Sequence, residues 1–254
     1  MNAVIIGSGN VATTMVRLML LKGINVSQVY SRNETSAKEL NKIYDVPCTS
    51  KVEEIVNDAD FYLLCISDDA LNENLSYLHR LNDKPVYHTA AAVSKEILKP
   101  ISDHYGVMYP LQSLRKEIKD LPRVPFLLDA NNDKALQLAI SIAEKIGDGF
   151  AIANDEERLK IHVAAVMVNN FTNHLFALAE EYCKTEKLEF DLLKPLIAET
   201  AQRILNSSPA KMQTGPAVRK DHITIEKHLK ILNKHPDLKQ LYLTMSNSII
   251  NHQR

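Results

Sequence analysis

A glycine-rich turn within the first twelve residues constrains the fold of this chain more than any other feature. Residues 3–6 form an apolar run of strand length, and residues 7–12 then read Gly-Ser-Gly-Asn-Val-Ala. Apolar side chains recur at Val11, Met15 and Leu18, which is the spacing of one helix face. A Gly-x-Gly-x-x-Ala pattern between a strand and a helix is typical of a unit that binds a dinucleotide. A glycine-rich turn without a nucleotide is the alternative.

Each position of this pattern has a physical role in dinucleotide binding. Gly7 permits the tight turn, Gly9 lets the backbone approach a pyrophosphate, and Ala12 is small enough for close packing of helix and strand. The start of the helix offers free N–H groups and the positive end of its dipole. We therefore expect the pyrophosphate to be bound by Gly7, Gly9, Asn10 and Val11.

The end of the second expected strand, residues 26–30, favours NADP(H) over NAD(H). An NAD site usually has Asp or Glu there, about 20 residues after the glycines, to bind the ribose 2′-OH. This chain has Ser31, Arg32 and Asn33 instead. A guanidinium can bind a 2′-phosphate through paired N–H groups, and the hydroxyl and amide add donors. The alternative is that Asn33 only caps the next helix and that Arg32 is a solvated surface residue.

The rest of the first half alternates strands with helices, which predicts a doubly wound parallel sheet. The further strands are expected at residues 61–66, 86–87, 107–109 and 126–128. The helices between them are expected to include a short one opened by a capping box at 50–53, one containing Leu71, Leu75 and Leu78, and one over 132–146.

Two of these strands end in polar residues, at the edge of the sheet where cofactors bind in α/β folds. Ser67 begins a polar loop after the strand at 61–66, and His88 follows the strand at 86–87. We therefore expect Ser67 and His88 to contact the cofactor. For His88 the alternative is a structural histidine with satisfied hydrogen bonds.

Strand patterning stops after residue 152, and the remaining sequence has the periodicity of helices. We therefore expect a Rossmann domain over residues 1–152 and an all-α domain over residues 153–254. Asn154 is placed to cap a helix that extends to about residue 182 without proline or glycine, roughly 40 Å at 1.5 Å per residue. The other helices of this domain are expected at 190–206, 221–232 and 237–250.

Polar side chains lie along one side of the expected long helix. His162, Asn169 and Asn170 fall there at helical spacing, amid apolar neighbours. Such groups are costly to bury without partners, so they form either a substrate or nicotinamide surface or an interhelical hydrogen-bond network. Because an unperturbed imidazole titrates near neutrality, His162 is the candidate proton donor. Asn169 and Asn170 are candidates for orienting the substrate.

A second unusual segment of the helical half begins with Thr214, Gly215 and Pro216, a sequence typical of a rigid turn. Arg219 and Asp221 follow within a few residues, at the start of a helix. We expect Thr214, Arg219 and Asp221 to contact the substrate. An ordered loop between helices is the alternative.

Composition and charge exclude several classes of protein. With 30 Lys and Arg against 31 Asp and Glu, the chain lacks the basic surplus that a nucleic-acid-binding protein needs. The longest apolar runs, 61–66 and 163–168, fall far short of the roughly 18 residues that span a bilayer. The three cysteines are scattered and indicate neither a disulfide framework nor a metal site. No targeting pattern precedes the first strand, so we expect a cytoplasmic protein.

These motifs together resemble those of known reductases. The glycine turn, the Ser-Arg-Asn segment and the order of an α/β domain before an all-α domain are similar to pyrroline-5-carboxylate reductase and the 6-phosphogluconate dehydrogenase-like reductases. The resemblance is closer to a bacterial family that joins an NADP-binding Rossmann domain, of the type seen in coenzyme F420-dependent NADP oxidoreductases, to a C-terminal helical domain of unknown function. The motifs that carry it are Val86-Tyr87-His88-Thr89, Tyr109-Pro110-Leu111-Gln112, Ile161-His162-Val163-Ala164-Ala165 with Asn169-Asn170, and Thr214-Gly215-Pro216 with Arg219, Asp221 and His228.

The resemblance implies NADP(H) as the cofactor and an all-α domain similar to the C-terminal domain of 6-phosphogluconate dehydrogenase. Two motifs depart from the family's pattern. Ala90 and Ala91 stand where Ser-Gly is expected, and Lys220 replaces a glycine. The lysine that serves as acid and base in the dehydrogenase-like relatives is also absent, since Val166 and nearby apolar residues occupy the matching positions.

These observations predict an NADP(H)-dependent oxidoreductase that transfers hydride to or from a small carbonyl or imine substrate, because hydride transfer requires only cofactor orientation and one proton donor. The two apolar sides of the long helix predict a homodimer formed through the helical domain. A non-catalytic NADP(H)-binding sensor or scaffold is the alternative, favoured by the missing lysine and the two altered motifs. A flavin or deazaflavin partner is a third possibility.

Overall fold

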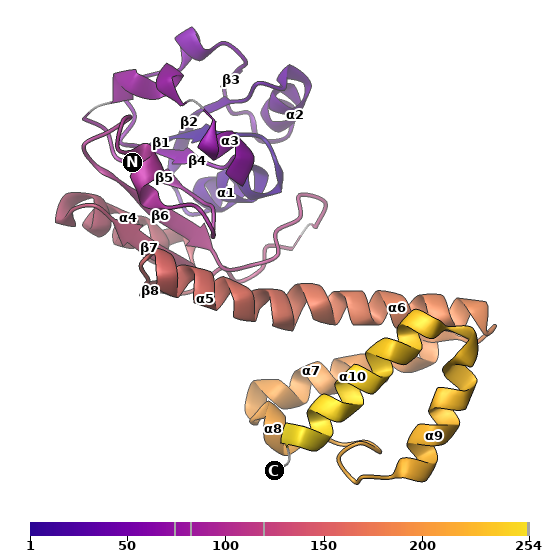
Figure 1. Cartoon of the computed structure of the whole chain (residues 1–254). Coiled ribbons are helices and arrows are strands. Elements are labelled where there is room, and N and C mark those ends of the chain that lie inside the picture. Colours follow the sequence, from indigo (N-terminus) through magenta and orange to yellow (C-terminus); the bar gives the residue numbers. More distant parts are fainter. Residues whose placement is uncertain (74, 82, 119, 253–254) are drawn as a thin grey trace. The chain divides into compact units, whose positions relative to one another are not determined.

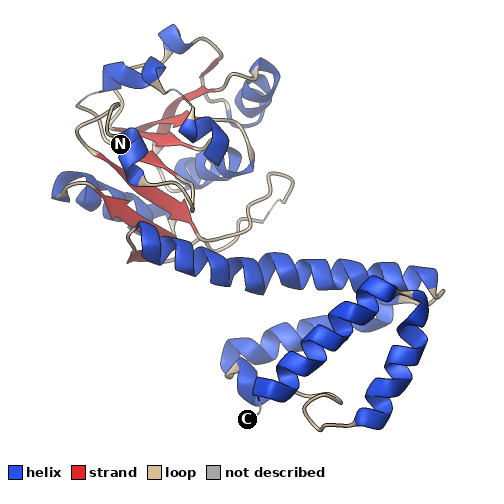
Figure 2. Cartoon of the chain, viewed as in Figure 1, coloured by secondary structure: helices blue, strands red, loops and turns tan. Residues whose placement is uncertain are grey.

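The first 152 residues build one sheet with helices on both faces (Figures 1 and 2). The structure is a computed structural model that describes residues 1–73, 75–81, 83–118 and 120–252. The strands are β1 Asn2–Ile6, β2 Asn25–Tyr30, β3 Cys48–Thr49, β4 Phe61–Leu64, β5 Val86–His88, β6 Tyr105–Pro110, β7 Phe126–Ala130 and β8 Phe150–Ile152. Their order across the sheet is β3-β2-β1-β4-β5-β6-β7-β8. The expected Rossmann-like α/β fold is confirmed.

The register brings three strand ends together. β1 lies between β2 and β4, parallel to both, with Ile6 opposite Tyr30 on one side and Leu64 on the other. The chain crosses from one side of β1 to the other at this point, so β1 and β4 border the crevice where ligands of open α/β sheets bind. This arrangement places the glycine turn after β1 beside the ends of β2 and β4.

Two apolar layers cover the sheet. On one face α1 (Asn10–Leu21), α2 (Glu34–Tyr44) and α4 (Asp133–Ile146) pack against buried side chains such as Ile5 and Phe61. On the other face lie α3 (Asp68–Asn72) and the short 3₁₀ helices 76–81 and 95–98, packed against Val4 and Tyr62. Burial of both faces explains why β4 is continuously apolar.

The sheet is not parallel throughout. β6 and β7 pair antiparallel, with Met108 opposite Leu128, whereas the other pairs among the described strands are parallel. The prediction of a wholly parallel sheet is therefore wrong at this pair. Residues 111–125 contain no helix in their described part, so the chain returns directly beside β6.

Two local predictions are also corrected. The capping box expected at 50–53 does not form, because the Thr49 hydroxyl accepts from the Lys51 N–H at 3.1 Å and bonds Glu54 Oε2 at 2.6 Å. A single 3₁₀ turn, Val52–Glu54, results. The helix expected around Leu71, Leu75 and Leu78 is split into α3 and the 3₁₀ helix 76–81, although all three leucines are buried.

The second half is helical, as expected. A continuous helical run comprises α5 (Asp155–Ala165), a π-helical segment (Val166–Phe171) and α6 (Thr172–Thr185). The remaining helices are the 3₁₀ turn Phe190–Leu193, α7 Lys194–Asn206, α8 Pro209–Met212, α9 His222–Ile231, the 3₁₀ turn Leu232–Lys234 and α10 Pro236–His252. Asn154 caps α5 in a capping box with Glu157. By its contacts the chain forms two compact units, residues 1–170 and 171–254. The division at 152 stays a prediction.

A buried arginine fixes the start of α5 to the sheet unit. The Arg158 side chain is 1% exposed, and it donates from Nε to the Ala91 carbonyl at 3.0 Å and from Nη2 to the Val93 carbonyl at 2.6 Å. Nη2 also pairs with Asp155 at 2.8 Å. The first turns of the long helix are therefore held by the segment that follows β5.

None of the helices in the described residues combines the length and the apolar character needed to cross a membrane. Among the same residues, no group of three or more His, Cys, Asp or Glu side chains is placed to bind a metal ion.

Candidate functional site

The turn between β1 and α1 requires its first glycine. Gly7 has a φ of +124°, and a Cβ there would overlap the backbone carbonyl of Cys65, the residue that directly follows β4. The Gly7 N–H donates to the Tyr30 carbonyl at 2.7 Å, which joins the turn to β2. Gly9 differs, because its φ is −79° and a Cβ there would meet open space. The conformation of the turn therefore requires Gly7, whereas Gly9 leaves the backbone open to a ligand because no side chain projects from it.

The N-terminus of α1 has no side-chain cap. The other α-helices of the unit 1–170 are capped, α2 by Asn33, α3 by Ser67, α4 by Asn132 and α5 by Asn154. The uncapped first turn contains Asn10 and Val11, two of the expected cofactor ligands. Free N–H groups and the positive end of the helix dipole fit a bound pyrophosphate.

A cavity of about 540 Å³ lies at the ends of β1, β2 and β4. Its lining includes six of the nine residues expected to bind the cofactor, namely Gly7, Gly9, Ser31, Arg32, Asn33 and Ser67. The remaining lining residues are Ile6, Ser8, Tyr30, Val52, Cys65, Ile66, Ala70, Glu73 and Tyr77. The volume is in the range of small-molecule and cofactor sites. We call it the β1–β4 cavity.

Of the three residues after β2, Ser31 is buried, whereas Arg32 and Asn33 are exposed. Ser31 is 6% exposed, and its hydroxyl bonds the Ser8 hydroxyl at 2.7 Å. Asn33 caps α2 by accepting from the Ser36 N–H at 3.0 Å, which is the capping role given above as the alternative to cofactor binding. The Arg32 side chain is 69% exposed and pairs with Glu73 at 3.2 Å. Arg32 is thus the residue of the three whose charge faces the cavity.

Ser67 and His88 differ in their access to a cofactor. Ser67 lines the β1–β4 cavity and caps α3 by accepting from the Ala70 N–H at 3.3 Å. His88 is fully buried, and its Nδ1 accepts from the Ala90 N–H at 3.2 Å. Burial, with the nearby Arg158 guanidinium, lowers the pKa of His88 to about 4. The structure therefore does not place His88 with the other expected ligands.

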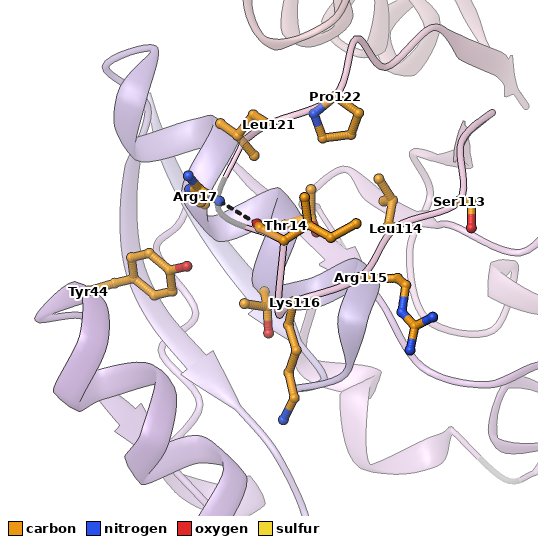
Figure 3. Close-up of a pocket in the computed structure, with 11 residues that line it drawn as sticks. Thr14, Arg17, Tyr44, Ser113, Leu114, Arg115, Lys116, Leu121 and Pro122 are labelled. Carbon is orange, nitrogen blue, oxygen red and sulfur yellow. Dashed lines mark hydrogen bonds between the residues drawn. The ribbon is translucent and has the colours of Figure 1, made fainter. Parts of the chain in front are cut away.

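The side chain of Asn10 already has a hydrogen-bond partner, a backbone N–H of the loop after β6. Its Oδ1 accepts from the Lys116 N–H at 3.3 Å, and Arg17 Nη1 of the same helix donates to the Ile118 carbonyl at 3.0 Å. Figure 3 shows Thr14 and Arg17 of α1 facing Leu114, Leu121 and other residues of this loop around a cavity of only about 60 Å³. That cavity is too small for a dinucleotide, and the contacts anchor the loop after β6 to α1.

A second cavity of the unit 1–170, about 590 Å³, contains the three expected catalytic residues His162, Asn169 and Asn170. The end of β6 and the segment after it also line this cavity, with Tyr109 from the strand and Leu111, Gln112 and Ser113 from the segment. From α5 and the π segment come Ile161, Ala164, Ala165 and Val168. We call it the Tyr109–His162 cavity.

Tyr109 and His162 form a hydrogen-bonded pair in this cavity. The Tyr109 hydroxyl lies 3.0 Å from His162 Nδ1, and the rings meet edge to face with centroids 5.8 Å apart. Burial, and secondarily the charge of Asp68, raises the pKa of Tyr109 above its ordinary value. The phenol therefore stays protonated near neutral pH and can donate to Nδ1. In the described part of the chain, Nε2 of His162 has no hydrogen-bond partner.

The π-helical segment presents Asn169 and Asn170. Both side chains are exposed, so no buried interhelical network holds them. A π segment widens the helix by one residue per turn and is frequent at functional sites. These amides are available to a ligand in the Tyr109–His162 cavity.

The three residues expected to contact the substrate belong to the other compact unit, 171–254. Asp221 caps α9 by accepting from the Thr224 N–H at 3.0 Å, and the hydrogen bonds from Thr224 lower the pKa of Asp221. Arg219 is exposed. Thr214 lines an apolar cavity of about 340 Å³ within that unit, together with Leu175, Pro216, Ala217, Leu238, Leu241, Tyr242, Met245, Ser246 and Ile249.

Four polar lining residues were not predicted to belong to a site. Tyr109 and Gln112 line one cavity and were noted only as part of a family motif, and Glu73 and Tyr77 line the other. Tyr109 had a usable signal, because it lies at the carboxyl end of an expected strand, on the ligand-binding edge. Glu73 and Tyr77 follow the strand β4 by several residues and had no such signal.

Comparisons with known proteins agree with this geometry. Residues 2–91 match the family model "NADP oxidoreductase coenzyme F420-dependent", and residues 124–249 match a domain of unknown function, DUF2520. The crystal structure of BF3122 from Bacteroides fragilis, described as a "putative NADP oxidoreductase", is similar with 35% identity and a TM-score of 0.90, covering 98% of both chains. No curated protein matches the chain.

Two more distant structures share the fold. The 1-pyrroline-5-carboxylate reductase of Streptococcus pyogenes has 13% identity and a TM-score of 0.66, over 99% of this chain and 98% of that one. The imine reductase of Myxococcus stipitatus, in complex with NADP⁺, has 12% identity and a TM-score of 0.62, over 99% of this chain and 92% of that one.

Proposed function

This chain belongs to the NADP oxidoreductase family that includes BF3122 of Bacteroides fragilis, and on that basis we propose that it transfers hydride between NADP(H) and a small carbonyl or imine compound. The observation that carries the proposal is the β1–β4 cavity, which combines an open Gly9, an uncapped α1 and an exposed Arg32.

The residues of this cavity fit NADP(H). The first turn of α1 would hold the pyrophosphate through its backbone N–H groups, next to Gly9, where a side chain is lacking. The Arg32 guanidinium would bind the 2′-phosphate, with Asn33 beside it. When bound, the nicotinamide supplies or accepts the hydride.

The Tyr109–His162 cavity supplies the protein's part of the chemistry. Reduction of a C=O or C=N bond adds one hydride to carbon and one proton to oxygen or nitrogen. In its protonated form the His162 imidazole would donate from Nδ1 to the Tyr109 oxygen and carry a second proton on Nε2, which it would transfer to the substrate and so return to the neutral ring. The exposed amides of Asn169 and Asn170 would orient the substrate and polarise the bond to be reduced.

A homodimer through the helical domain is part of the proposal. In the unit 171–254, large apolar side chains are exposed on several helices, including Leu192 at 78%, Leu205 at 77% and Ile223 at 70%. Apolar surface of this extent on one unit is typical of a protein interface. A second copy of the chain, covering the same surface by two-fold symmetry, is the simplest partner.

The second candidate is a non-catalytic NADP(H) sensor. Val166 stands where the dehydrogenase-like relatives have their acid–base lysine, so this chain depends on His162 alone for that role. Turnover distinguishes the two candidates, because a sensor binds the cofactor and reduces nothing.

Calorimetric titration with NADPH and NADH tests the cofactor assignment. We expect the wild type to bind NADPH more tightly than NADH. Arg32→Ala should lower the affinity for NADPH by about tenfold, because charge-assisted hydrogen bonds are lost. Arg123→Ala is the matched control, because that side chain is 87% exposed, pairs with Asp148 and lies outside the cavity. Binding of neither coenzyme would refute the proposal.

Turnover with a panel of small imines and carbonyls then tests the proton donor. We expect His162→Ala to lower kcat about 100-fold or more while the NADPH affinity stays within a few-fold. Full activity of this variant would show that His162 is not the donor. Absence of turnover by the wild type, with tight NADPH binding, would favour the sensor.

A further inference from the structure

A carboxylate pairs with the guanidinium that is proposed above to bind the 2′-phosphate. Glu73 Oε2 lies 3.2 Å from Arg32 Nη1, and both residues line the β1–β4 cavity. The two residues come from different elements, because Arg32 follows β2 and Glu73 caps the C-terminal end of α3. Both side chains are largely exposed, so they remain accessible to a ligand that enters the cavity.

The backbone fixes where Glu73 stands. Ser67 caps α3 at the end of β4, and the Glu73 N–H donates to the Asp69 carbonyl at 3.0 Å at the other end of this short helix. Leu71, between them, is fully buried in the core. The Glu73 carboxylate is therefore presented from an anchored element and not from a free loop.

The two coenzymes make opposite demands on this pair. The 2′-phosphate of NADP(H) carries close to two negative charges at neutral pH and needs the N–H groups of Arg32. Glu73 competes for the same guanidinium and repels the phosphate. The ribose of NAD(H) instead carries a 2′-OH, a donor that a carboxylate accepts, and the usual carboxylate at the end of β2 is absent from this chain.

We propose that Glu73 is a specificity-determining residue that limits the preference of this site for NADP(H) and lets it accept NAD(H). The proposal rests on the proposed binding of NADP(H) in the β1–β4 cavity. In the free protein Glu73 neutralises Arg32. NADP(H) displaces the carboxylate from the guanidinium. NAD(H) leaves the ion pair intact, and its 2′-OH donates a hydrogen bond to the Glu73 carboxylate.

The test is Glu73→Gln, which keeps the shape of the side chain and removes its charge. Calorimetry would measure the Kd of NADPH and NADH, and of adenosine 2′,5′-bisphosphate and 5′-AMP as probes of the adenosine end alone. We expect Glu73→Gln to lower the Kd of NADPH and of the bisphosphate by about fivefold. The Kd of NADH and of 5′-AMP should stay unchanged or rise. The gain should shrink as salt is raised, because the interactions are solvent-exposed.

Glu39→Gln is the matched control. Glu39 is also an exposed glutamate in an ion pair, with Lys116 at 3.8 Å, but it lies on α2 outside the cavity lining. We expect this variant to change each Kd by less than twofold.

The outcomes separate this inference from the proposed function. The role of Glu73 is refuted if the wild type and Glu73→Gln have the same ratio of the Kd for NADPH to the Kd for NADH, or if the variant binds NADPH more weakly. In either case the cofactor assignment stands. If the wild type binds neither coenzyme, the proposed function fails and the role of Glu73 fails with it.

Discussion

Single side chains in the β1–β4 cavity differ in whether they have partners within the fold. Ser31 is bonded to Ser8, and Asn33 and Ser67 cap helices, so these polar groups also stabilise the local structure. Among the described residues, the ion-pair partner of Arg32 is the exposed Glu73. The Ser-Arg-Asn sequence indicated the right place for a 2′-phosphate site. It did not reveal Glu73, because a contact across 41 positions depends on how two strands are paired.

At the same scale, the buried His88 gives the protein a pH-dependent stability. Its pKa falls to about 4 on folding, from an ordinary 6.5, because burial and the Arg158 guanidinium disfavour the charged ring. A hydrogen bond with the Ser94 backbone and the charge of Asp155 offset this only in part. Between these values the unfolded chain binds a proton that the folded chain does not. The stabilisation is therefore complete above about pH 6.5 and is lost as pH falls towards 4.

We expect this histidine to lower the free energy of unfolding by about 2 to 3 kcal/mol between pH 7 and pH 4.5. Urea unfolding at several pH values measures the slope for the wild type and for His88→Asn, which cannot titrate there. The variant should have the flatter slope, whereas His252→Asn, an exposed histidine, should match the wild type. Equal slopes for wild type and His88→Asn would contradict the assignment.

At the scale of elements, the β1–α1 turn separates two roles of glycine. We expect Gly7→Ala to lower the free energy of unfolding by about 2 kcal/mol or more, because it forces a positive φ and a clash with the Cys65 carbonyl. Gly9→Ala should leave thermal stability nearly unchanged, since its φ is ordinary and its surroundings are open.

Gly9→Ala should nevertheless lower the affinity for NADPH by about tenfold, because a Cβ would lie between the backbone and the pyrophosphate. Thermal melts and calorimetry on the two variants measure stability and binding separately. Normal NADPH affinity of a well-folded Gly9→Ala would show that the pyrophosphate does not bind at this turn.

Elements with strong local signals could be predicted, and those set by pairing could not. The fingerprint, the apolar run of β4 and the capped α4 and α5 were all evident in the sequence. The antiparallel pairing of β6 with β7 was not, because the strand pattern is the same in either direction. The π segment at 166–171 was also missed, since its residues are apolar and amide side chains that fit an ordinary helix.

At the scale of the whole molecule, the exposed apolar surface of the helical unit predicts a dimer. Light scattering during size exclusion should give twice the 28.6 kDa of one chain. We expect the double variant Leu192→Asp/Leu205→Asp to shift the protein to monomer, because two charges would be buried in the interface. Ile43→Asp is the control, on α2 of the other unit and 66% exposed. A monomeric wild type would refute the dimer.

The long helix shows why a boundary between units is hard to find from sequence. Residues 155–185 contain neither proline nor glycine, so nothing local marks where contacts pass from one unit to the other. The division lies between Asn170 and Phe171. On the side of the sheet unit, the helix is held by the bond of His162 to Tyr109 and by the bonds of Arg158 to the segment after β5, contacts between residues more than 50 positions apart.

The Arg158 anchor also determines how this protein can be recombined with others. A chimera joined at residue 152 would take α5 from a foreign parent and leave the Ala91 and Val93 carbonyls without their guanidinium. A chimera joined after Asn170 would inherit that anchor and His162, the proposed proton donor, together with the sheet unit. The natural module for exchange is thus the sheet with the helical residues up to Asn170.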